Sequence, residues 1–180
     1  MDNEVYTPED DSFFLVSILE REIPKLLNKN KSLKVLEVGS GSGIQLKTLK
    51  NLNVKNIQAA DINKKAVALC KKLGFNVIQS NLFQKIKKTE KYDLIIFNPP
   101  YLPQHKYDNK QKDTTGGKKG NETINLFLKQ AKSHLNNSGK IFLLTSSFTP
   151  VLGFKGYKKK ILDEKQIFFE KLYVWELVKI

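Results

Sequence analysis

The chain has 180 residues, 40% of them apolar and 27% charged, which predicts a globular protein with one domain (residues 1–180) and a sizeable core. No apolar run approaches the roughly 20 residues of a membrane-spanning helix, and the acidic opening "MDNEVYTPEDDSF" is not a secretory signal. A single cysteine excludes an internal disulfide and favours a reducing, cytoplasmic location, and with only two histidines it argues against a structural metal site or a His-dependent triad.

The formal net charge is +13, and nearly all of the positive charge is lysine, since Arg21 is the only arginine. Such a charge is typical of proteins that bind nucleic acid or another anionic partner. Phosphate-binding sites, however, usually include arginine, and these lysines are spread along the chain. A solvated lysine-rich surface and a charge-steered partner such as RNA both stay open.

Hydrophobic periodicity predicts strands and helices that alternate along most of the chain. Strands are expected at residues 33–38, 56–62, 76–79, 92–97, 140–145, 157–167 and 169–179. Helices are expected at residues 12–27, 44–50, 64–73 and 121–135, with Asn63 capping the third and a turn at residues 136–139. The order predicts an α/β fold with a seven-stranded, mostly parallel sheet and one antiparallel strand near an edge. Residues 1–30 are expected to pack on this core.

The stretch "EVGSGSG", residues 37–43, follows a buried strand and opens a helix. Ligands of such folds bind at the carboxyl ends of the strands, where glycines such as Gly39 and Gly41 permit close approach. The pattern departs from the pyrophosphate fingerprint G-x-G-x-x-G, and Glu37 would repel a pyrophosphate. A tight turn without a ligand is the alternative.

Acidic and amide residues follow the next two strands. Asp61 ends the second strand, where a carboxylate can hold both ribose hydroxyls, and Asn81 and Leu82 follow the third, where an adenine edge would lie. The set indicates a nucleoside without phosphates. A sulfonium beside Glu37 points to S-adenosylmethionine as the cofactor.

The stretch "NPPY" ends the fourth strand. Proline fixes φ and lacks an N–H, and it also forces the preceding residue into an extended conformation, so Asn98, Pro99 and Pro100 form a stiff segment. The Asn98 side-chain oxygen and the Pro99 carbonyl can converge on one NH₂ group, with Tyr101 as a flat face for a planar group. Acceptors placed in this way favour a nitrogen that gains positive charge during methylation. We therefore assign catalysis to Asn98, Pro99 and Tyr101; a simple strand-ending turn is the alternative.

Taken together, "EVGSGSG", "ADI" (residues 60–62) and "NPPY" resemble class I S-adenosylmethionine-dependent methyltransferases that modify amide or exocyclic amine nitrogens. "VYTPEDDSF" (residues 5–13), "TTGGKKGNETINLFL" (114–128) and "FFEKLYVWEL" (168–177) are similar to motifs of the HemK-like family, in its short archaeal and eukaryotic branch. The resemblance implies a Rossmann-like class I fold. It also implies cofactor contacts from a set of residues at the strand ends: Ser12, Glu37, Gly39, Asp61, Asn81 and Leu82. Asn98, Pro99, Pro100 and Tyr101 would bind the substrate.

The same resemblance implies a substrate and partners. The branch methylates the side-chain N5 of the GGQ glutamine of class I peptide-chain release factors, and its eukaryotic members work with a small zinc-binding activator subunit. N6-adenine methylation of DNA or RNA is the alternative, because "NPPY" suits adenine and the charge suits nucleic acid. A non-catalytic binding module is a third hypothesis, and the intact "NPPY" argues against it.

Overall fold

A computed structural model describes residues 5–100, 121–150 and 152–180. Within these residues the helices are α1 (Asp10–Lys29), α2 (Ile44–Asn51), α3 (Lys64–Lys72), α4 (Glu122–Ala131) and the short 3₁₀ helix η1 (Lys132–His134). The strands are β1 (Lys34–Val38), β2 (Asn56–Asp61), β3 (Asn76–Gln79), β4 (Tyr92–Phe97), β5 (Leu135–Ser146), β6 (Tyr157–Ile167) and β7 (Glu170–Lys179).

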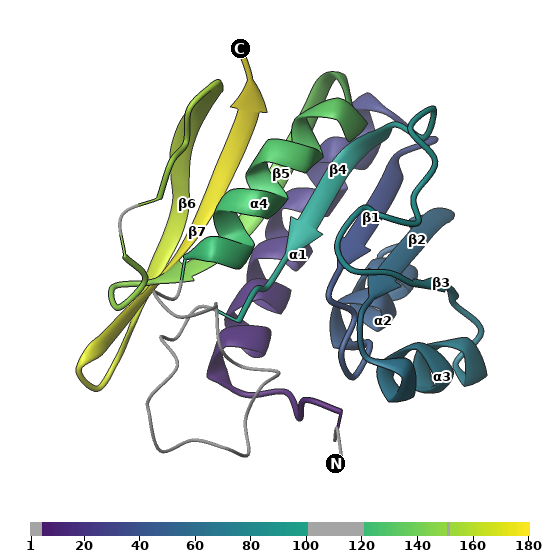
Figure 1. Cartoon of the computed structure of the whole chain (residues 1–180), viewed down its shortest axis with the longest axis horizontal. Helices are drawn as coiled ribbons and strands as arrows, with labels where there is room; N and C mark the ends of the chain where they lie inside the picture. The colour runs from purple at the N-terminus through teal and green to yellow at the C-terminus, as the bar shows by residue number, and fades with distance from the viewer. Residues whose placement is uncertain (1–4, 101–120, 151) are drawn as a thin grey trace.

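The strands of the described residues form one seven-stranded sheet in the order β3-β2-β1-β4-β5-β7-β6. Strands β1 to β5 pair in parallel, whereas β7 runs antiparallel to both β5 and β6 (Figure 1). The mostly parallel sheet with one antiparallel strand next to an edge is therefore confirmed. The carboxyl ends of the parallel strands meet at the lower edge in Figure 1, where the hairpin between β6 and β7 also turns.

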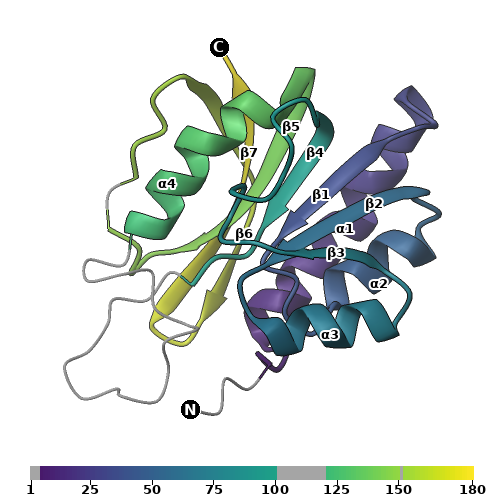
Figure 2. The same cartoon turned by 45° about the vertical axis from the view of Figure 1, so that its right-hand side comes forward.

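Helices cover both faces of the sheet, as the two views in Figures 1 and 2 show. On one face, α1 packs on β1, β4, β5 and β7 through residues such as Leu15 and Ile23, and α2 and α3 pack on β2 and β3 around Cys70. On the other face lie α4 and the segment between β3 and β4, whose Phe127 and Phe83 rings are 5.6 Å apart. The strands between these layers are buried on both sides, which explains their continuous apolar runs.

Most predicted elements match the structure to within two residues, and Asn63 caps α3 by accepting hydrogen bonds from the backbone N–H groups of Lys65 and Ala66. The predicted turn at residues 136–139 is wrong, because these residues belong to β5. There the register with β4 is irregular. Asn136 donates to Asp93 over 2.6 Å, and a Cβ at Gly139 would lie 2.8 Å from the Tyr92 carbonyl oxygen. The turn-forming residues thus build an irregular strand segment that β4 holds in place.

Among the described residues, no helix combines the length and the apolar character that crossing a bilayer requires.

Candidate active site

The glycine loop connects β1 to α2 at the carboxyl edge of the sheet. Gly39 and Gly43 both have a φ of 76°, in the left-handed region where a side chain is strained. A Cβ at Gly43 would lie 3.0 Å from the Cys70 sulfur on α3, so close packing also requires glycine there. Gly41 has a φ of 47° and no atom within 4 Å of where its Cβ would be. The loop is therefore packed closely at Gly43 and open at Gly41.

Asp61, at the end of β2, holds this loop in place. One of its carboxylate oxygens accepts hydrogen bonds from the Gly41 N–H over 2.8 Å and the Ser40 hydroxyl over 3.2 Å. The other accepts from the Asn63 N–H over 2.8 Å. A carboxylate has about four lone-pair directions, so it retains capacity for a further hydrogen bond. Asp61 thus shapes the loop and keeps acceptor capacity for ligand hydroxyls.

Glu37 lies in β1, is 2% exposed and is buried within the sheet. Its Oε2 is buried and has no hydrogen-bond partner among the described residues. Burial, and secondarily the nearby charge of Asp61, raise the pKa of Glu37 well above its ordinary value. A buried carboxylate in this position is destabilised when ionised unless a positive charge approaches it. The site therefore favours a cationic ligand group.

The segment after β3 lies beside Asp61, because the Ser80 N–H donates to the Asp61 carbonyl over 2.8 Å. Ser80 also donates through its hydroxyl to the Leu82 carbonyl, and Leu82 has a φ of 50°, which is rare for a non-glycine residue. Leu82 is buried whereas Asn81 is exposed. Both predicted adenine-side residues thus follow a residue that is hydrogen-bonded to the backbone of Asp61.

Asn98 follows β4, and its two side-chain atoms have different surroundings. Nδ2 donates to Oδ2 of Asp11 over 2.9 Å. Oδ1 is buried and has no hydrogen-bond partner among the described residues. A carboxylate accepts only, so the Asp11 contact fixes which end of the Asn98 amide carries the oxygen. Asn98 is thereby held with an unused acceptor, and its own carbonyl lies 3.9 Å from where a Gly39 Cβ would be.

Asp11 belongs to this site although the sequence patterns did not single it out. It is 7% exposed at the start of α1, and its Oδ1 accepts from the Tyr6 hydroxyl over 3.0 Å and from the Ser12 hydroxyl over 3.2 Å. The Ser12 carbonyl in turn accepts a 3.5 Å hydrogen bond from Gln45 on α2. The only signal was the motif "VYTPEDDSF", which contains Tyr6, Asp11 and Ser12 but does not show that they meet Asn98.

The structure brings the predicted residues of the cofactor side and Asn98 together at one edge of the sheet. Pro99 is buried and Pro100 half-buried behind Asn98. Tyr101 lies outside the described residues, as does much of the motif at residues 114–128. Histidine, cysteine and carboxylate side chains form no group of three suited to a metal ion in the part of the chain that the structure describes.

Residues 12–163 match the family model of the methyltransferase small domain. The chain belongs to this methyltransferase family. It is also 33% identical to a putative protein N5-glutamine methyltransferase of Methanocaldococcus jannaschii, over 97% of this chain and 93% of the relative. The human methyltransferase HEMK2 is 30% identical over 79% of this chain and 72% of its own length. The resemblance to the HemK-like methyltransferases is therefore confirmed.

Solved structures agree with this assignment. The E. cuniculi Mtq2–Trm112 complex, described as responsible for methylation of the eRF1 translation termination factor, contains a chain with a TM-score of 0.74 and 26% identity. The match covers 97% of this chain and 98% of that one. A Thermus thermophilus 16S rRNA N2 G1207 methyltransferase has a TM-score of 0.67 at 17% identity, covering 97% of this chain and 44% of that one, and shares the fold. The chain is thus a methyltransferase with the class I fold.

Proposed function

We propose that this protein methylates the side-chain amide nitrogen of the GGQ glutamine in a class I peptide-chain release factor. The names of two relatives support this substrate. The archaeal relative is named a protein N5-glutamine methyltransferase. A relative from Schizosaccharomyces pombe is named an eRF1 methyltransferase catalytic subunit, and it is 27% identical over 78% of this chain and 72% of its own length. The observation that carries the proposal is the buried Oδ1 of Asn98, which has no hydrogen-bond partner among the described residues and belongs to an amide that Asp11 holds through Nδ2.

An amide nitrogen is a poor nucleophile because its lone pair is delocalised. As it bonds to a methyl group it gains positive charge, and its N–H groups become stronger donors. Asn98 Oδ1 and the Pro99 carbonyl would accept these hydrogen bonds, which strengthen toward the transition state and so lower the barrier. The chain needs no general base for this step, because the nitrogen can lose its proton to water afterwards.

When bound, S-adenosylmethionine supplies a methyl group activated by its sulfonium. We propose that Gly39 and Gly41 allow the ligand to approach the backbone and that the free acceptor capacity of Asp61 takes the ribose hydroxyls. Glu37 would stabilise the ligand's positive charge, since its Oε2 is buried and unpartnered among the described residues. Ser12, Asn81 and Leu82 complete the proposed contacts, with Asn81 and Leu82 on the adenine side.

We further propose a cytoplasmic location and an activator subunit as partner. The fold neighbour Mtq2 was solved with Trm112, and the S. pombe relative is named a catalytic subunit, which implies another subunit. By analogy this chain would work with a small zinc-binding protein. Purification of the chain with its bound proteins, followed by their identification, checks this part separately.

The test is methyl transfer to the cognate release factor in the presence of the activator. Mass spectrometry of the GGQ peptide should show one added methyl group on glutamine. No mass shift on that peptide, in protein that binds S-adenosylmethionine, would contradict the proposed substrate.

Adenine is the second candidate, favoured by the net charge of +13 and by the suitability of the same two acceptors for an exocyclic amine. Labelled methyl transfer to DNA or RNA, measured beside the release factor, separates the two substrates. Transfer to nucleic acid alone would establish the alternative.

A further inference from the structure

A groove of about 500 Å³ lies between the start of α1 and the β6–β7 hairpin. Its lining divides into two kinds of side chain. Four are acidic, namely Glu9, Asp10, Asp11 and Glu170, and three are apolar, namely Phe13, Ile167 and Leu172. The groove is thus both acidic and apolar, on a chain whose net charge is +13.

The acidic charge of the groove is only partly compensated within the described residues. Asp10 forms an ion pair with Lys165 of β6 over 2.9 Å, and Asp11 accepts from Asn98. Glu170 is different, because its Oε1 is buried and has no hydrogen-bond partner there. Leaving a buried carboxylate oxygen without a donor costs free energy, which a donor supplied by a binding partner would offset.

The hairpin tip beside the groove carries two exposed phenyl rings. Phe168 is 91% and Phe169 is 96% exposed. Gln166 bridges the tip, because its Nε2 donates to the carbonyls of Phe168 over 2.8 Å and Glu170 over 3.1 Å. Phe168 has a φ of 49°, a conformation that aromatic residues rarely adopt. Neighbouring exposed aromatic residues on a hydrogen-bonded turn are typical of an interaction surface.

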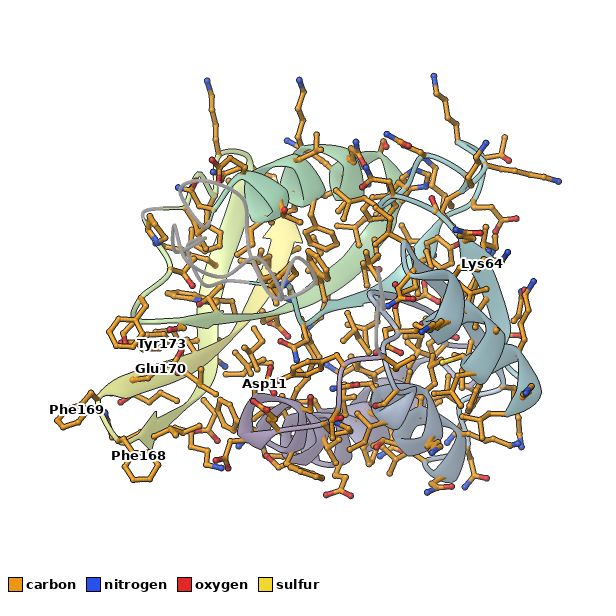
Figure 3. The ribbon with its side chains drawn as sticks, turned by 60° about the horizontal axis from the view of Figure 1, so that its bottom comes forward. Asp11, Lys64, Phe168, Phe169, Glu170 and Tyr173 are labelled. Atoms are coloured by element: carbon orange, nitrogen blue, oxygen red, sulfur yellow. The ribbon has the colours of Figure 1, made fainter. Side chains whose placement is uncertain are left out.

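This surface continues from the candidate active site. Asp11, whose side chain accepts a 2.9 Å hydrogen bond from Asn98, also lines the groove. Figure 3 shows Asp11 at the start of α1, with Glu170 between it and the tip that carries Phe168 and Phe169. Arg21 links α1 to the hairpin, because it donates to Asp163 over 2.6 Å and to the Leu162 carbonyl over 3.0 Å. A polypeptide whose glutamine reaches Asn98 can therefore extend into the groove.

We propose that the groove and the hairpin tip bind a cationic stretch of the substrate protein, with at least one apolar side chain, that lies next to the methylated glutamine. Charge complementarity selects this occupant: lysine or arginine would donate to Glu170 and Glu9, while an apolar side chain would pack between Phe13 and Leu172. A nucleic acid would be repelled by the same carboxylates. The inference deepens the proposed function and rests on it.

The test compares the Michaelis constants of charge variants for the intact release factor, with the activator present. Glu170→Lys combined with Glu9→Lys should raise KM about tenfold with kcat nearly unchanged, because the change weakens binding remote from the reacting amide. Glu170→Gln keeps the shape of the side chain and should raise KM about threefold. Added salt should raise the wild-type KM more than that of the double variant.

Glu20→Lys is the matched control, since Glu20 is an exposed residue of α1 that does not line the groove. It makes the same change of charge as each of the two groove substitutions, Glu170→Lys and Glu9→Lys, and should leave KM unchanged. Phe168→Ser with Phe169→Ser should raise KM by about as much as Glu170→Gln. Unchanged affinity for S-adenosylmethionine, measured by calorimetry, shows that each variant is folded.

Two outcomes overturn the inference while leaving the proposed function intact. In one, the wild-type protein methylates the release factor and the groove variants have the same KM as the wild type. In the other, the lysine variants gain affinity for RNA and methylate it faster, which would assign the groove to a repulsive role near a nucleic acid. If the wild-type protein does not methylate the release factor at all, the proposed function fails first.

Discussion

The two sides of the candidate site are assembled over very different distances along the chain. On the cofactor side, Asp61 binds Gly41, 20 residues away, within one strand–helix–strand unit. On the amide side, Asn98 binds Asp11, 87 residues away, and only after α1 has packed on the sheet. The glycine loop and Asp61 on the cofactor side can therefore form from local structure, whereas the geometry of the amide acceptor depends on the N-terminal segment. Mutations should separate cofactor binding from methyl transfer.

The largest difference between the effect on methyl transfer and the effect on cofactor binding is expected for Asn98→Ala. The substitution removes the acceptor proposed to face the reacting nitrogen and leaves the glycine loop and Asp61 unchanged. Loss of one preorganised group of this kind reduces kcat by about 10²- to 10³-fold. Methyl transfer measured by mass spectrometry should fall by that factor while calorimetry shows nearly the same affinity for S-adenosylmethionine. Transfer at the wild-type rate would contradict the role of Asn98.

The second largest effect on methyl transfer is expected when the hydrogen bond between Asp11 and Asn98 is changed. Asp11→Asn would place an NH₂ group against Nδ2 of Asn98, which would turn its amide and point the wrong atom at the substrate. Asn98→Asp would place two carboxylates against each other. Each single change should lower kcat about 100-fold, in the range found when an orienting partner is lost.

Combining the two substitutions supplies the control. Exchanging the two side-chain types between positions 11 and 98 restores one donor and one acceptor at the contact, and the Tyr6 and Ser12 donors keep an acceptor at position 11. The double variant should therefore be at least about tenfold more active than either single variant, a coupling that independent sites do not show. Additive losses would mean that the contact does not orient the acceptor.

The same contrast explains what could be predicted from the sequence. Strands β1 to β4 and the Asn63 cap follow from short-range patterns, and so do the glycine loop and Asp61. Asp10 and Asp11 are adjacent and chemically identical in the sequence, but Asp10 is exposed and pairs with Lys165 while Asp11 is buried against Asn98. Only the packing of α1 distinguishes them.

The wrong prediction at residues 136–139 has the same origin. Asparagine, serine and glycine favour a turn when only neighbours in sequence are considered. In the folded protein the side chain of Asp93 accepts from Asn136, and Gly139 fits against the Tyr92 carbonyl, so β4 determines the conformation. The roles of the cofactor-side residues and of Tyr101 stay predictions. Variants of the glycine loop and of Glu37 test the cofactor side.

Within the glycine loop, Gly43→Ala and Gly41→Ala should differ in what they damage. Gly43 combines a positive φ with a 3.0 Å approach to the Cys70 sulfur, so alanine there should lower the free energy of unfolding by about 2 kcal/mol. Gly41 has open space around it, so alanine should cost about 1 kcal/mol from backbone strain. Thermal unfolding measures the difference, and equal losses would contradict the packing argument.

The smallest expected effect concerns the proton on Glu37. Burial and Asp61 raise the pKa of Glu37 in the folded protein, so the unfolded chain ionises first as pH rises. Without a ligand, this carboxylate therefore lowers stability progressively from the ordinary glutamate range up to its raised pKa. A cation bound beside Glu37 lowers that pKa again, so binding should release a proton and tighten with pH up to the raised pKa.

Calorimetry in two buffers that differ in ionisation enthalpy measures the proton released when S-adenosylmethionine binds. Glu37→Gln should abolish the release and weaken binding about tenfold, because a neutral amide stabilises the positive charge less. The same variant should unfold at a higher temperature than the wild type near neutral pH without ligand, because glutamine has no charge that folding must either bury or neutralise with a proton. Proton release that persists in Glu37→Gln would assign the titration to another group and leave the cofactor side without its proposed counter-charge.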